Sequence, residues 1–154
     1  MIFENEDLFL DFIKKNKNDL TFVCIGTNEY VWDSFGPLLG DELIKIPNLK
    51  VIGNSKNEIN GENIEQLKSY NIDNTKTIYI DSFISNNTNN IGNLDFKDDI
   101  LLPGLGCGES LMLIQAFYLS LITVNDDFSK VIDKNYILSI INKIILKIKS
   151  ITIL

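Results

Sequence analysis

The feature that most constrains the fold is an alternation of short apolar runs with amphipathic segments. Residues Leu20–Ile25 form an apolar run that ends at Gly26, a pattern typical of a strand buried on both faces. Residues 49–52 and 75–80 are expected to be further strands, the last rich in β-branched residues and tyrosine. Helices are expected before and between these strands, over residues 5–16, 34–46 and 62–70.

The second half of the chain continues the alternation. Residues 91–96 and 100–102 are interpreted as strands, and a glycine loop over 103–108 leads into a helix ending near residue 123. A long helix is expected over 129–149, because isoleucines recur there at helical spacing. With right-handed crossovers, this order predicts one α/β domain over residues 1–154. Its expected form is a three-layer sandwich with a central, mostly parallel sheet flanked by helices.

Net charge and composition exclude several classes of function. The chain has 154 residues, a net charge of −7 and no histidine. The acidic balance argues against a nucleic-acid partner. The absence of histidine removes histidine triads and histidine metal ligands, so acid/base chemistry falls to Asp, Glu, Lys, Tyr or Cys.

The cysteines and the two terminal segments indicate the cellular compartment in which we expect the protein. Cys24 and Cys107 form neither a disulfide framework nor a metal motif, so we expect reduced thiols in the cytoplasm. The N-terminal residues are acidic, unlike a signal peptide. The apolar stretch 136–154 contains three lysines, which argues against a membrane-spanning helix.

Two aspartates, Asp33 and Asp81, are each placed where an expected strand ends. The carboxyl ends of strands in an open α/β sheet are where ligands collect. Two carboxyls that meet there cannot both ionise cheaply, so one holds a proton while the other activates water. The alternative for Asp33 is a helix N-cap, and for Asp81 a cap or a turn into Ser82.

The glycine loop offers backbone N–H groups from Gly104, Gly106, Cys107 and Gly108 to an oxyanion or a substrate. The simpler interpretation is a tight turn that needs glycine dihedral angles. Glu109 is either a first-turn helix acid or a third carboxylate. A metal-dependent amidase with Asp33, Asp81 and Glu109 as oxygen ligands is therefore a further alternative, although the main hypothesis needs no cofactor.

Several blocks resemble the YyaC-type sporulation proteins, which are related to the germination protease of spore-forming bacteria. The first is Cys24-Ile-Gly-Thr followed by Asp33-Ser-Phe-Gly-Pro-Leu-Leu-Gly40. The others are Val51-Ile-Gly-Asn54 with Asn63-Ile64, Ile78-Tyr-Ile-Asp-Ser82 and Leu102-Pro-Gly-Leu-Gly-Cys-Gly108. They keep their order over about residues 20 to 125.

The resemblance implies a fold like that of the hydrogenase maturation endopeptidases. It implies a hydrolase acting on a peptide or amide bond in sporulation or germination, with Asp33 and Asp81 as its catalytic aspartates. The implied substrates are peptides or proteins, such as small acid-soluble spore proteins, in the cytoplasm of the sporulating cell or the spore core. The isoleucine stripe of the last helix leaves a homo-oligomer open.

The chain also departs from that family. Tyr30-Val-Trp32 stands where the family has small or polar residues, and Glu58-Ile-Asn60 replaces a stretch with a histidine. The related maturation endopeptidases bind nickel partly through a histidine, which this chain lacks. The alternative hypothesis is a non-catalytic sporulation factor that binds a peptide or protein in the same cleft.

Overall fold

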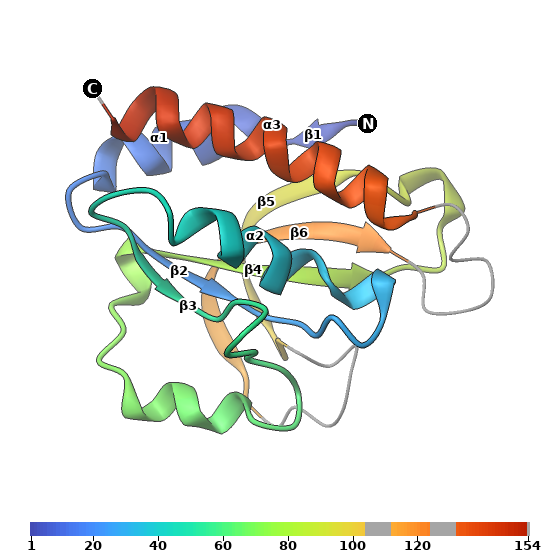
Figure 1. The fold of residues 1–154 in the computed structure, drawn as a ribbon, viewed down its shortest axis with the longest axis horizontal. Helices are drawn as coiled ribbons and strands as arrows, with labels where there is room; N and C mark the ends of the chain where they lie inside the picture. The colour runs from blue at the N-terminus through green and yellow to red at the C-terminus, as the bar shows by residue number, and fades with distance from the viewer. Residues whose placement is uncertain (104–111, 124–131, 154) are drawn as a thin grey trace.

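The computed structural model describes residues 1–103, 112–123 and 132–153. Within these residues a single six-stranded sheet has the strand order β1-β5-β6-β4-β2-β3 (Figure 1). The strands are β1 (Phe3–Glu4), β2 (Thr21–Cys24), β3 (Lys50–Ile52), β4 (Thr77–Ile84), β5 (Leu94–Leu101) and β6 (Ile114–Thr123). Neighbouring strands are parallel except β5 and β6, which are antiparallel. The expected α/β sandwich with a mostly parallel sheet is confirmed.

The two faces of the sheet are covered differently. The helices α1 (Glu6–Asn16), α2 (Phe35–Leu43) and α3 (Lys134–Thr152) all lie on one face, where they contribute to the larger apolar core (Figure 1). A smaller core on the other face includes Ile64 and Leu67 of the 3₁₀ helix η2 (Ile64–Ser69). Among the described residues, the second outer layer is therefore short 3₁₀ structure and loop.

The last helix shows how the sequence produces this packing. Asp133 precedes α3, and its side chain accepts a hydrogen bond of 2.8 Å from the Tyr136 backbone N–H. This bond satisfies one of the free N–H groups of the first turn. The inward face of α3 is a buried stripe of isoleucines at positions 137, 140, 141, 144, 145 and 148. Burying that stripe on the sheet is what stabilises the helix.

The structure corrects several expected elements. Residues 114–123 form the strand β6, although a helix was predicted over 109–123. Apart from Gln115, Ser120 and Thr123 the segment is apolar on both of its faces, so its sequence pattern does not distinguish a strand from a helix. Its pairing with both β4 and β5 makes it a strand. The predicted strands 91–96 and 100–102 are one continuous strand, β5, and the predicted helix 62–70 is the 3₁₀ helix η2. The pair of residues in β1 was not predicted.

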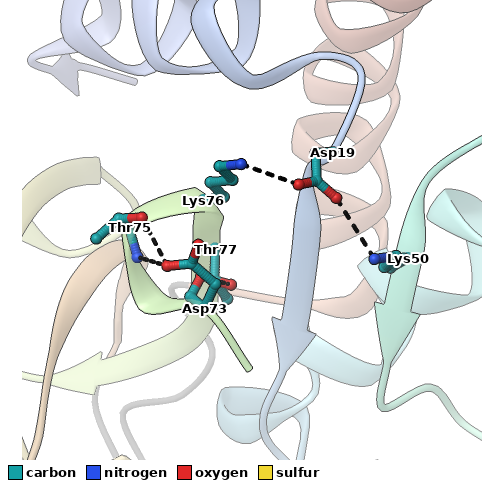
Figure 2. A network of polar contacts seen from close by, with 6 residues as sticks. All are labelled: Asp19, Lys50, Asp73, Thr75, Lys76 and Thr77. Carbon is teal, nitrogen blue, oxygen red and sulfur yellow. Dashed lines mark hydrogen bonds and ion pairs between the residues drawn. The ribbon is translucent and has the colours of Figure 1, made fainter. Parts of the chain in front are cut away.

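A polar network ties together the amino ends of the three strands β2, β3 and β4 (Figure 2). Asp19 forms ion pairs with Lys76 at 3.0 Å and with Lys50 at 3.4 Å. Its pKa is lowered, mainly by the hydrogen bond and charge of Lys76. These side chains are largely exposed, so each pair contributes little to stability. The network marks the edge of the sheet opposite to the carboxyl ends of these strands.

Candidate active site

The candidate site is formed where β2 ends and the chain turns toward α2. Beyond the last strand residue, the Ile25 backbone N–H still donates to the Ile80 carbonyl at 2.8 Å. The chain then loops out and returns, because the Thr27 N–H donates to the Asp33 carbonyl at 2.9 Å. Gly26 allows this return: its φ is +145°, and a Cβ there would lie 2.2 Å from the Asp33 carbonyl oxygen. The loop thus brings Asp33 back to the end of β2.

Asp33 is a buried acid with an unusual charge state. It ends the 3₁₀ turn η1 (Val31–Asp33), which packs against β4, and only 1% of its surface is exposed. Its pKa is raised to about 8, first by burial and then by the negative charge of Asp81. The Thr27 backbone N–H lowers this pKa and the charge of Glu58 raises it slightly. The Asp33 carboxyl therefore keeps its proton at neutral pH.

The structure does not place Asp33 as a helix cap. Ser34 occupies the cap position of α2, and no side-chain cap bond forms there. The Ser34 hydroxyl instead donates to the Val31 carbonyl at 2.8 Å. Among the described residues, the Asp33 Oδ2 atom is buried without a hydrogen-bond partner. A polar atom in that condition costs free energy in the folded protein, so Asp33 contributes no evident structural bond through Oδ2.

Asp81 lies inside a strand rather than at its end, which corrects the sequence-based prediction. β4 continues past Asp81 to Ile84, paired with β6, whereas β2 stops opposite Ile80. Asp81 is therefore the first residue of β4 beyond the end of β2. Its Oδ1 atom accepts a hydrogen bond of 2.8 Å from the Ser82 N–H. This bond resembles the local turn that was the alternative interpretation, but the strand does not turn there.

A pocket of about 270 Å³ adjoins Asp81. Its described lining is apolar apart from Asp81 and two serines, Ser82 and Ser120. The apolar members are Phe83, Ile84, Leu101 and Leu102. The structure therefore brings the two aspartates close enough for their charges to interact and places one of them on the wall of a cavity.

A second polar network holds the loop before Asp33. Glu58, which is half-buried, accepts a hydrogen bond of 2.8 Å from the Asn28 backbone N–H. The Asn28 side chain donates to the Ser55 hydroxyl at 2.7 Å, and Ser55 in turn bonds to Asp41 of α2. These bonds fix the position of Glu58 beside the loop. Sequence reasoning attached no role to Glu58.

The same loop presents an aromatic pair. The rings of Tyr30 and Trp32 stack with centroids 5.0 Å apart and planes 16° from parallel. Tyr30 is 42% exposed and Trp32 is partly exposed. In the sequence, Tyr30 and Trp32 were noted only because Tyr30-Val-Trp32 stands where the YyaC-type family has small or polar residues. The only sequence feature that could have pointed to this pair is its position just before Asp33.

Other predicted site residues can be placed only in part. Gly104, Gly106, Cys107, Gly108 and Glu109 lie outside the described residues. Cys24 is buried, and burial raises the pKa of its thiol, so it is packing rather than a reactive group.

Neither a metal cluster nor a spanning helix is found in the described part of the chain. No group of three or more Asp, Glu or Cys side chains there could hold a metal ion. No helix within residues 1–103, 112–123 and 132–153 is long and apolar enough to cross a bilayer.

Fold and site together define an α/β-sandwich protein with a buried, protonated aspartate beside a second aspartate past the end of β2. The chain belongs to the family described as "Protein of unknown function (DUF1256)", whose model matches residues 1–151. No match to the chain was found among curated proteins or among solved structures. The family description names no activity, so the likeness to YyaC-type proteins and to the germination protease stays a prediction.

Proposed function

We propose that this protein hydrolyses a peptide or amide bond with Asp33 and Asp81. The observation that carries the proposal is the unequal state of the two carboxyls. Asp33 is buried and holds a proton at neutral pH, partly because the negative charge of Asp81 lies close to it. A pair that shares one proton supplies an acid and a base within one site. No histidine is needed, and the chain has none.

In the proposed reaction Asp81 is the base and Asp33 is the acid. Asp81 takes a proton from water as the water oxygen attacks the carbonyl carbon. Asp33 gives its proton to the leaving nitrogen when the carbon–nitrogen bond breaks. The proton on Asp81 then passes to Asp33 through solvent, which restores the starting state. The products are a carboxylic acid and an amine.

The pocket beside Asp81 supports this assignment, because it gives the reacting group a place to lie next to the base. Its wall includes Leu101 and Leu102, which lie shortly before the glycine loop in the sequence. The proposed oxyanion role of Gly104, Gly106, Cys107 and Gly108 remains a prediction from the sequence. So does a role in sporulation or germination, which comes from the resemblance alone.

The test is cleavage by the full chain and by three variants. Small acid-soluble spore proteins and a mixed peptide library are incubated with each protein, and fragments are identified by mass spectrometry. Asp33→Asn and Asp81→Asn should each abolish cleavage while circular dichroism shows a retained fold. Asp7→Asn is the matched control, since Asp7 is an exposed acid in the first turn of α1. Wild-type rates in both site variants would refute the proposal.

A second candidate function is peptide binding without cleavage. It is favoured by the bond from the Ser82 N–H to Asp81, which holds that carboxylate in place without a substrate. The departures at Tyr30-Val-Trp32 and Asn60 from the YyaC-type pattern also favour it. Saturable binding of a peptide that is recovered intact by mass spectrometry would identify this function.

A further inference from the structure

The stacked pair of Tyr30 and Trp32, together with Val31 between them, is called here the aromatic turn. It directly precedes Asp33 in the chain, and Val31 and Trp32 share the 3₁₀ turn η1 with Asp33. Exposed aromatic rings are costly to leave in water and serve as contact surfaces for ligands. A face of Tyr or Trp attracts a cation through the negative charge of its π system.

Carboxylates lie on and beside the loop that carries the aromatic turn. Glu29 is exposed on the loop, and Glu58 bonds to the neighbouring Asn28. The charged groups that raise the pKa of Asp33 are both carboxylates, those of Asp81 and Glu58. Among the described residues, none of the ion pairs includes Glu29, Glu58 or Asp33. No lysine in the described part of the chain therefore forms an ion pair with these three carboxyl groups.

We propose that the aromatic turn and Glu58 form a binding site for a lysine or arginine side chain of a peptide. The ring faces and the carboxylate supply the two contacts by which proteins recognise such cations. The buried Asp33 Oδ2, which has no partner within the described residues, lies at the same loop. The whole chain carries a net charge of −7, which draws basic peptides toward it.

This inference rests on the proposed function, since it names the substrate class of the same site. It makes the preferred substrate a peptide with a basic residue near the bond that is cleaved. Asp33 and Asp81 act on the amide, whereas the aromatic turn and Glu58 select the peptide. Tyr30, Trp32 and Glu58 are then specificity residues, not catalytic residues.

Trp32 is the single tryptophan of the sequence, so its fluorescence reports on the aromatic turn alone. The full wild-type chain is titrated with three capped pentapeptides that carry lysine, norleucine or glutamate between alanines. The lysine peptide should shift the emission saturably and bind about tenfold more tightly than the norleucine peptide. Its affinity should fall as salt is raised from low to physiological concentration. Equal affinity for lysine and norleucine, or no binding of either, would overturn the inference.

Two variants and one control locate the contacts. Glu58→Gln keeps an oxygen to accept from the Asn28 N–H but removes the charge, and Tyr30→Leu removes a ring but keeps an apolar side chain. Each should weaken the lysine peptide about fivefold and leave the norleucine peptide unchanged. Glu65→Gln, which alters an exposed acid of η2, should change neither. A lysine preference that survives both site variants would also overturn the inference.

Mass spectrometry of the same mixtures separates the two proposals. Binding that prefers lysine without any cleavage would refute hydrolysis and keep the inferred binding site. Cleavage with no preference between the lysine and norleucine peptides would support hydrolysis and refute the inferred binding site.

Discussion

Replacing Asp33 by asparagine should make the protein more stable at neutral pH, even though it removes the proposed acid. When folding raises the pKa of an acid, ionising that acid costs more free energy in the folded protein than in the unfolded chain. The protein therefore loses stability as pH rises through the range between the two pKa values. Stability from this group is fully present below the pKa of 3.8 that an aspartate has in the unfolded chain, and is lost as pH rises toward the folded pKa of about 8. Asparagine keeps the shape of the side chain and does not titrate.

The size of the effect follows from the shift. Each pKa unit corresponds to about 1.4 kcal/mol, so a shift of about four units is on the order of 5 kcal/mol in total. Between pH 5 and pH 8 the wild type should lose about 3–4 kcal/mol relative to Asp33→Asn, because most of the shift falls in that interval. Asp33 is 1% exposed, so solvent does not screen this effect appreciably.

The assay is urea unfolding of wild type and Asp33→Asn at pH 5, 6.5 and 8, followed by circular dichroism. The difference in the free energy of unfolding between the two proteins isolates Asp33 from the other acids. Asp73→Asn is the control, because hydrogen bonds from Thr75 lower the pKa of Asp73, so this carboxyl is already ionised at pH 5 and its difference from wild type should not change between pH 5 and pH 8. A difference between wild type and Asp33→Asn that stays constant over this pH range would show that Asp33 ionises normally.

Two further predictions concern the site and its support. If Asp33 is the acid, kcat/KM should fall as pH rises through about 8, and a pH–rate profile that stays flat to pH 9.5 would contradict that role. Gly36→Ala should destabilise the fold by about 1–3 kcal/mol in urea unfolding, because the new Cβ would lie 2.1 Å from the Ile25 carbonyl oxygen. Glu42→Ala on the exposed side of the same helix should change stability by less than about 0.5 kcal/mol.

Local patterns in the sequence were enough to predict much of the fold. The isoleucine stripe of α3 and the apolar run of β2 are signals that a short window contains in full, because burial on one face or on both faces repeats along the chain. The segment 114–123 is one whose structure local patterns did not predict. Most of its side chains on both faces are apolar, and only pairing with β4 and β5, which are distant in sequence, makes it a strand.

The sequence by itself also singled out Asp33 and Asp81 as candidate residues, from their positions after apolar runs. It could not determine that β4 runs on past Asp81 or that Tyr30 and Trp32 stack beside Asp33. Nor could it determine the pKa of Asp33, since desolvation and the charge of Asp81 depend on where the folded chain places other residues. Residue types and local periodicity are properties of the chain, whereas burial and charge interactions arise only when the loop after β2 folds back against β4.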